Sequence, residues 1–188
     1  MMFMELDEAI RGRRKRRSIR RYTARPVPLE LVREVLEAGT WAPSAKNGQQ
    51  WRFTVLTGDV KKRLTDLFWS ELQTLSNKIG KEKMGSSFSS CRIMEQAPVL
   101  IMVWNAGERV WETEMQSVAA SVQNMLLKAH SLGLGSLWIG DIYYAHDPLE
   151  KHLCKPWKLM AAVTLGWPAS TQKAPRRLTV DEVSEFLS

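Results

Sequence analysis

The feature that most constrains the fold is an apolar helix predicted over residues 115–132, which contains no internal glycine or proline. Its apolar side chains cover more than half of its circumference, so we expect burial on two sides. They are Val118, Ala119, Ala120, Val122, Met125, Leu126, Leu127 and Ala129. In a chain of 188 residues, the protein's own sheet covers one side and we expect a second copy of the chain to cover the other. Gly133 and Gly135 end the helix.

Three further segments have the pattern of strands. Residues 98–104 and 159–167 are continuous apolar runs typical of buried strands, whereas residues 51–57 alternate between polar and apolar side chains. Apolar residues at helical spacing predict a helix from Leu29 that ends before Pro43. Because helices flank a few strands without a regular repeat, we expect one α+β domain over residues 1–188, with a single sheet.

Other segments are less regular. Residues 60–95 begin with a helical period and continue as a polar stretch rich in glycine and serine, which we expect to be mobile and to cover the substrate. Short helices are predicted over residues 6–12 and 146–153 and at the end of the polar tail. Residues 136–144 (SLWIGDIYY) form a loop or a short strand in this interpretation.

The positive charge of the chain is concentrated in one place. The formal net charge is +7, and residues 11–21 (RGRRKRRSIRR) contain eight cations and no acid. Without them, 19 cations face 20 acids, so the basicity is local. This pattern indicates an anion site or a basic arm rather than a generally basic surface.

Several classes of protein are excluded or disfavoured. No apolar run approaches the ~20 residues of a membrane span, and the N-terminal residues lack a signal-peptide pattern. Two cysteines, Cys91 and Cys154, do not make a disulfide scaffold, so we expect a cytoplasmic protein. Dinucleotide and nucleotide-phosphate loops, catalytic elbows and metal-ligand clusters are absent from the sequence, and we expect no metal. An enzyme of this sequence would take its chemistry from a cofactor.

Three motifs remain as candidate binding elements. Arg16, Ser18 and Arg20 project to one side of an extended segment, which suits a phosphate, although a solvated arm is the alternative. Residues 42–51 (APSAKNGQQW) carry hydroxyl and amide groups suited to a heterocycle, or form an ordinary helix-to-strand loop. Residues 133–141 (GLGSLWIGD) allow backbone to approach a flat ligand, or form a tight connection.

Together, and in this order, these motifs and the later K-A-P-R-R resemble the nitroreductase family of FMN-dependent oxidoreductases. The resemblance spans residues 6–183 and implies one central, mainly antiparallel sheet flanked by helices in an intertwined homodimer. It also implies cofactor contacts from four segments, with the loop contacts made to the flavin of the other subunit. The implied cofactor-binding residues are Arg16, Arg17, Ser18 and Arg20 at the phosphate, Pro43, Ser44, Ala45, Asn47 and Gln49 in the loop, Trp138, Ile139, Gly140 and Asp141 beside the isoalloxazine, and Arg176 and Arg177, with Lys173, at the phosphate again.

The resemblance implies a ping-pong oxidoreductase in which NADH or NADPH reduces FMN and FMN reduces a nitroaromatic, a quinone or a similar small acceptor. No protein side chain is then a catalytic nucleophile. The alternatives are a flavin-binding or flavin-modifying protein without reductase turnover, and a basic-arm protein that binds nucleic acid, for which aromatic residues among the cations are lacking.

Two departures from the family pattern stand out. Gln50 occupies a position where proline usually precedes the tryptophan, and the extra cations Arg11, Arg13, Arg14 and Lys15 exceed what a phosphate requires. Four aromatic residues are candidates for covering the flavin, although core packing is the more common role of such residues. They are Phe68, Trp69, Trp104 and Trp111.

Overall fold

The computed structural model describes residues 16–108, 111–170 and 172–187. Four strands form one antiparallel sheet in the order β1-β2-β4-β3. They are β1 (Trp51–Leu56), β2 (Val99–Asn105), β3 (Gly135–Ile139) and β4 (Lys158–Gly166). The α+β prediction is therefore confirmed, and β1 and β3 form the two edges of the sheet.

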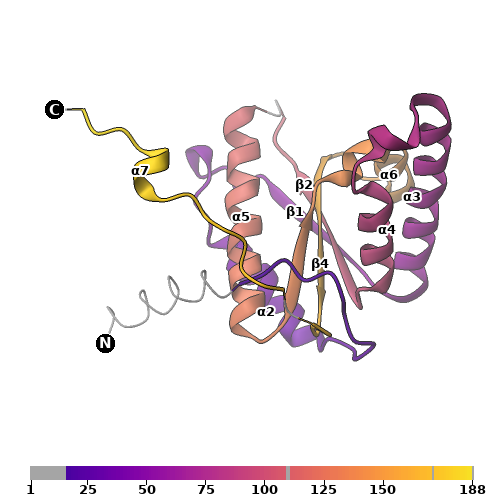
Figure 1. Cartoon of the computed structure of the whole chain (residues 1–188), viewed down its shortest axis with the longest axis horizontal. Helices are drawn as coiled ribbons and strands as arrows, with labels where there is room; N and C mark the ends of the chain where they lie inside the picture. Colours follow the sequence, from indigo (N-terminus) through magenta and orange to yellow (C-terminus); the bar gives the residue numbers. More distant parts are fainter. Residues whose placement is uncertain (1–15, 109–110, 171, 188) are drawn as a thin grey trace.

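Helices cover both faces of the sheet (Figure 1). On one face lie α2 (Leu29–Thr40) and α5 (Glu112–Ser131). On the other face lie α3 (Gly58–Ile79), α4 (Ser87–Gln96) and α6 (His146–Leu153). Short 3-10 helices η1 (Ala45–Asn47), η2 (Lys81–Met84) and η3 (Asp141–Ala145) connect the larger elements, and the one-turn helix α7 (Val180–Val183) lies near the C-terminus.

The pleat of β2 explains the two apolar cores. Ile101 and Val103 pack with α2 and α5, whereas Met102 and Trp104 pack with α3, α4 and α6. Every residue of β2 is buried, as the continuous apolar run predicts. Burial of both faces fixes the register of the strand, because a shift by one residue would exchange the two sets of side chains.

The long apolar helix predicted over residues 115–132 is α5, which begins three residues earlier than predicted. The Glu114 carboxylate accepts a hydrogen bond from the Trp111 backbone N–H at 3.2 Å, which stabilises a helix start at Glu112. One face of α5 is buried against α2 and the sheet, whereas Ala119, Ala120 and Leu127 are half-buried in the single chain. Burial of that second face by another copy stays a prediction.

Residues 81–91, the polar part of the segment expected to be mobile, form η2 and the first half of α4, and their mobility stays a prediction. Met84, Cys91 and Met94 are buried against α3, and the serine-rich composition conceals this apolar spacing. Its role as a substrate cover stays a prediction.

The remaining terminal predictions have mixed outcomes. The helix predicted over 6–12 lies outside the described residues. At the other end, α7 has only four residues, and its capping box joins Thr179 and Glu182. Within the described residues, no helix combines the length and hydropathy needed to cross a membrane.

Candidate functional site

The basic segment runs along the edge strand β3. Ser18 and Ser136 form a parallel bridge, and the Ile19 backbone N–H donates to the Ser136 carbonyl at 3.0 Å. A Cβ atom at Gly135 would lie 2.8 Å from Ile19, so glycine permits this close approach. The Tyr22 hydroxyl, which lies 2.7 Å from the Thr164 hydroxyl, anchors the end of the segment in the core. The extended conformation predicted for this segment is thus present.

A cavity of about 420 Å³ lies at this end of β3. Arg16 and Arg17 line it, together with Ser136 and Gln172. Burial lowers the pKa of Arg16, and the neighbouring Arg177 and Arg17 lower it further. Two arginines therefore line the cavity and a third, Arg177, lies close enough to Arg16 to lower its pKa, an arrangement that an anion would stabilise.

Two other predicted phosphate contacts, Arg20 and Arg176, have partners within the chain. Arg20 is exposed and donates to the Gln172 side-chain oxygen at 3.0 Å. Arg176 is engaged in an exposed ion pair with Glu182 at 2.7 Å. Of the C-terminal pair, Arg177 lies close enough to Arg16 to lower its pKa.

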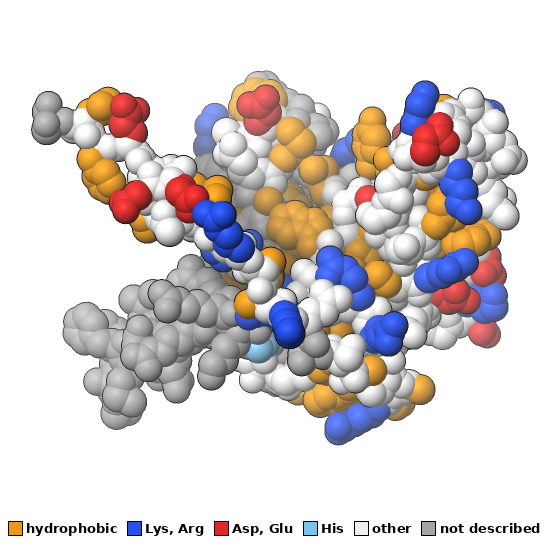
Figure 2. All heavy atoms as spheres, in the orientation of Figure 1, with side chains coloured by type: hydrophobic (Ala, Val, Ile, Leu, Met, Phe, Trp, Pro, Cys, Tyr) orange, Lys and Arg blue, Asp and Glu red, His pale blue; other side chains and the backbone are white. Residues whose placement is uncertain are grey.

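A larger cavity of about 750 Å³ lies beyond the other end of β3. Gly140 lines it, and a Cβ atom at this glycine would meet no described atom within 4 Å, so the backbone is open to a ligand. Ser136 and Gly140 are four residues apart, a span of about 13 Å along an extended strand. One strand thus connects the cationic cavity to the larger one. Figure 2 shows hydrophobic side chains in a hollow between α5 and the helices of the opposite layer.

The residues around Gly140 differ in what their side chains do. Trp138 is 40% exposed, and Ile139 is buried in the core. The Asp141 carboxylate accepts hydrogen bonds from Ser86 and Ser90. The side chains of Ile139 and Asp141 therefore stabilise the fold, and the backbone groups of these residues remain as candidate contacts with a ligand.

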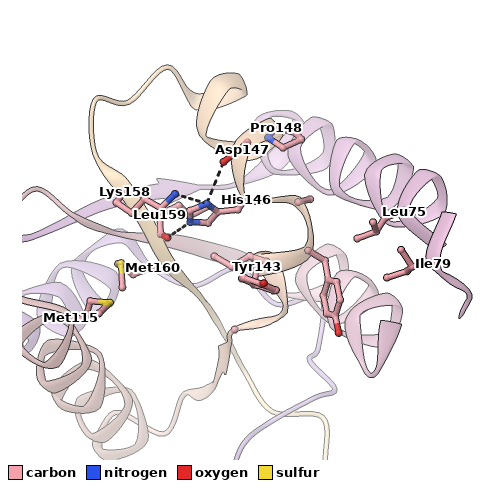
Figure 3. Close-up of a pocket in the computed structure, with 14 residues that line it drawn as sticks. Leu75, Ile79, Met115, Tyr143, His146, Asp147, Pro148, Lys158, Leu159 and Met160 are labelled. Carbon is pink, nitrogen blue, oxygen red and sulfur yellow. Dashed lines mark hydrogen bonds and ion pairs between the residues drawn. The ribbon is translucent and has the colours of Figure 1, made fainter. Parts of the chain in front are cut away.

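A hydrogen-bonded pair lies in the wall of the larger cavity (Figure 3). One ring nitrogen of His146, Nε2, lies 2.6 Å from the Leu159 carbonyl oxygen, and the other, Nδ1, lies 2.8 Å from Lys158 Nζ. Because a carbonyl oxygen only accepts, Nε2 carries the proton and Nδ1 accepts from the ammonium. His146, Asp147 and Glu150 have metal-ligating atoms close together, but both ring nitrogens already have partners.

The loop 43–49 lies against the first half of α5. The Ala45 N–H donates to the Ser117 hydroxyl at 2.9 Å, and the Gln49 N–H donates to the Ser44 hydroxyl at 3.0 Å. Lys46, Asn47 and Gln49 have positive φ angles. Among the described residues, neither cavity is lined by this loop. Its predicted contact with the flavin of a second subunit stays a prediction.

Gln50, which departs from the family pattern, braces this loop. Its side-chain amide donates to the Ala45 carbonyl at 3.4 Å, and its Oε1 atom is buried without a partner among the described residues. A Cβ atom at Gly48 would lie 2.4 Å from the Gln50 amide nitrogen, so the glutamine fills the space beneath the loop.

The four aromatic candidates for covering the flavin differ in their burial and contacts. Phe68 and Trp104 are fully buried core residues, and Trp69 makes an edge-to-face pair with Phe88. Trp111 is 47% exposed at the start of α5, with Lys46 Nζ 5.9 Å from its ring centroid.

Several cavity residues escape prediction from the sequence. Ser136 lies inside a glycine motif, where it is identifiable, but Gln172 belongs to a polar tail without pattern. Tyr143, His146 and Lys158 line the same cavity because the connection between β3 and β4, which contains η3 and α6, folds back on itself. A lone histidine and a lone lysine separated by eleven residues give no signal in the sequence.

The chain is thus an α+β protein in which an edge strand connects a guanidinium-lined cavity to a larger cavity. The model of the nitroreductase family matches residues 14–167, and the chain belongs to that family.

Relatives and solved structures agree with this assignment. A protein of Methanothermobacter thermautotrophicus named "Putative NADH dehydrogenase/NAD(P)H nitroreductase" is 33% identical over 149 residues, which are 78% of this chain and 66% of that protein. A crystal structure from Desulfovibrio desulfuricans, described as a "putative nitroreductase in complex with fmn", is 33% identical with a TM-score of 0.78, covering 96% of this chain and 97% of that one. A nitroreductase with bound FMN from Bacteroides fragilis is 27% identical with a TM-score of 0.78, covering 96% and 99%.

Proposed function

We propose that this protein is an FMN-dependent oxidoreductase that takes hydride from NADH or NADPH and passes it to a nitroaromatic, a quinone or a similar small acceptor. The observation that carries the proposal is the pair of cavities joined by β3. The cluster of Arg16, Arg17 and Arg177 fits a phosphate, and the open backbone at Gly140 fits the edge of a flat ring. The FMN complexes among the similar structures support it.

The residues present fit FMN in charge and shape. The phosphate end would be held by Arg16, Arg17, Ser18 and Arg20 with Arg177, and the ring by the backbone of residues 138–141. When bound, FMN supplies two-electron hydride chemistry at its N5 atom. The chain's own residues bind, orient and shield: the guanidinium groups neutralise the phosphate, and the Ile139 side chain anchors β3 so that the Gly140 N–H keeps its direction.

A homodimer is part of the proposal. The half-buried face of α5 and the loop 43–49 both lie where the single chain provides no ligand cavity. The tail carries exposed apolar side chains that would find a partner on a second copy. They are Leu178, Val180, Val183, Phe186 and Leu187.

The proposal is tested by FMN binding and turnover. We expect purified protein titrated with FMN to bind one molecule per chain, to lose flavin absorbance when NADPH or NADH is added without oxygen, and to regain it with menadione. Parallel lines in double-reciprocal plots are the signature of a ping-pong cycle. Failure to bind FMN would refute the proposal, and FMN binding without reduction by either nucleotide would favour a flavin protein without reductase turnover.

A sedimentation experiment tests the dimer. We expect the holoprotein to sediment as a dimer, and deletion of residues 178–188 to weaken that dimer measurably. A monomer that still binds FMN with unchanged affinity would contradict the assignment of loop 43–49 to the partner's site.

A further inference from the structure

The larger cavity has apolar walls and one cationic donor. Leu75, Ile79, Met115 and Met160 form apolar parts of the wall, and Lys158, at the start of β4, lies in the wall with its ammonium directed at His146 (Figure 3). Such a cavity suits a planar, largely apolar molecule with at least one oxygen acceptor.

Lys158 is held in place by its neighbours. Its ammonium donates one hydrogen bond to His146 Nδ1 at 2.8 Å, and the Leu159 carbonyl fixes the ring of His146 from the opposite side. The Glu150 carboxylate lies 3.6 Å from Lys158 Nζ and itself accepts from the Leu159 N–H at 2.6 Å. An ammonium has three N–H groups, and the Lys158 side chain is 41% exposed, so its contacts with His146 and Glu150 leave donor capacity for a ligand in the cavity that Lys158 lines.

The charges around the Lys158 ammonium favour a neutral ligand over a carboxylate ligand. Glu150 lies close enough to offset most of the Lys158 charge, and the exposed Asp147 carboxylate lies 3.7 Å from His146 Nδ1. A carboxylate ligand would therefore gain little from Lys158. A neutral ligand with a carbonyl or nitro oxygen gains a directed hydrogen bond without repulsion from the acids.

We propose that Lys158 is a catalytic residue that donates a hydrogen bond, and then a proton, to an oxygen of a neutral quinone in this cavity. His146 is a positioning residue that sets the direction of the ammonium. This inference rests on the proposed function, because it places the acceptor beside the segment 138–141.

The step balances for a quinone. The quinone receives a hydride, which originates from NADH or NADPH, and becomes a hydroquinone monoanion. A Lys158 N–H bond then breaks, an O–H bond forms at the anionic oxygen, and the product leaves as neutral hydroquinone. The amine of Lys158 regains a proton from water at the exposed mouth of the cavity.

The test compares Lys158→Met with Lys155→Met in the FMN-loaded protein. Lys155 is an exposed lysine of the preceding turn that does not line the cavity, so it is a matched control. We expect Lys158→Met to slow reoxidation of the reduced protein by menadione at least tenfold, while reduction by NADPH changes less than twofold. Lys155→Met should change neither rate.

A binding measurement gives a second readout. Menadione does not react with the oxidised protein, so its Kd can be measured by calorimetry, and we expect Lys158→Met to weaken it threefold or more. In Lys158→Arg the guanidinium restores the hydrogen bond but holds its proton, so menadione binding should recover while reoxidation stays slow. His146→Gln should raise the KM for menadione more than it lowers kcat, because it disturbs only the direction of the ammonium.

The outcomes separate this inference from the proposed function. If wild-type protein binds FMN and is reduced by NADPH, yet Lys158→Met matches Lys155→Met in both reoxidation rate and menadione Kd, the role of Lys158 is refuted. If Lys158→Met does not fold, the same comparison is made with Lys158→Gln. If the wild type fails to bind FMN or to be reduced, the proposed function itself is wrong.

Discussion

The Asp141 carboxylate accepts a hydrogen bond from the Ser90 hydroxyl at 2.5 Å, which ties the turn after β3 to α4. The same oxygen accepts from Ser86 at 2.7 Å, so a carboxylate occupies the N-terminus of α4, where the helix dipole favours a negative charge. Asp141 follows Gly140 directly in the sequence. The residue that anchors α4 is therefore also the neighbour of the backbone proposed to meet the flavin ring.

We expect Asp141→Ala to loosen this connection. The change leaves the Ser86 and Ser90 hydroxyls without their acceptor, and charge-assisted bonds of this kind are each worth about 1.5–3 kcal/mol when buried, less for a half-buried carboxylate. Faster hydrogen exchange of amides in residues 83–92 is the expected observation. The exposed Asp147 provides the control, and equal exchange in Asp141→Ala and Asp147→Ala would show that the contact contributes nothing.

Sequence periodicity predicts where helices and strands form better than it predicts which of them pack against one another. The helix over 29–40 and the strands at 51–56 and 99–105 follow directly from the spacing of apolar residues. The segment over 81–91 does not, because Met84 and Cys91 reach the core from a stretch whose glycines and serines suggest a loop. Helix formation there depends on tertiary contacts with α3, which local propensity does not contain.

Some residues of the candidate site can likewise be predicted from the sequence, whereas others cannot. Arg16, Arg17 and Ser18 are predictable, because an extended basic segment projects alternate side chains to one side. The approach of Arg177 to Arg16 is suggested only by the resemblance, since 160 residues separate them and no local pattern encodes the return of the tail. The pair of His146 and Lys158 depends on the distance between α6 and β4 in space, which the sequence alone does not give.

The arginines at the cationic cavity should determine the affinity for FMN through its phosphate. We expect Arg16→Ala combined with Arg20→Ala to weaken FMN binding about 100-fold or more, since each lost charged contact costs about 1.5–3 kcal/mol. Riboflavin lacks the phosphate, so its affinity should be the same in the double variant and the wild type. Arg63→Ala, on the exposed surface of α3, is the control for general loss of charge.

An equal loss of FMN and riboflavin affinity in the arginine double variant would contradict the phosphate assignment and indicate damage to the fold instead. Fluorescence titration with both ligands, at one fixed salt concentration, makes the comparison.

Two adjacent lysines at the start of α3 should differ sharply in their effect on stability. Lys61 is buried, and its ammonium donates to the Glu95 carbonyl at 2.6 Å and to the Ala97 carbonyl at the end of α4. Burial lowers the pKa of Lys61. We expect Lys61→Met to reduce the free energy of unfolding by about 1–3 kcal/mol, because it leaves these carbonyl oxygens unpaired.

Lys62 is the matched control, since it is exposed and pairs with the exposed Asp66 one turn away. In urea denaturation, we expect Lys62→Met to have the same free energy of unfolding as the wild type, because exposed ion pairs contribute little to stability. Equal destabilisation by the two substitutions would show that the connection between Lys61 and α4 is not what stabilises this end of the helix.

The two cysteines should differ in reactivity. Burial raises the pKa of the Cys91 thiol to about 12, whereas Cys154 is exposed. At pH 8 in the native state, we expect a disulfide reagent to modify one thiol per chain, because the thiolate is the reactive form. The second should react only when the protein unfolds. Rapid modification of two thiols in the folded protein would contradict the burial of Cys91 against α3.

The same raised pKa predicts a loss of stability in alkali. The unfolded thiol ionises near pH 8.5–9, but the native thiol keeps its proton until about pH 12, so within this window the unfolded state binds fewer protons. The free energy of unfolding therefore falls as the pH rises, with a slope of up to about 1.4 kcal/mol per pH unit from this group. The pKa of the buried Tyr22 is also raised, which adds to the loss above pH 10. Urea denaturation of wild type and Cys91→Ala between pH 8 and 11 separates the two residues, since the variant should lose less stability over that interval. Parallel curves for the two proteins would show that the Cys91 thiol ionises as easily in the native state as in the unfolded chain.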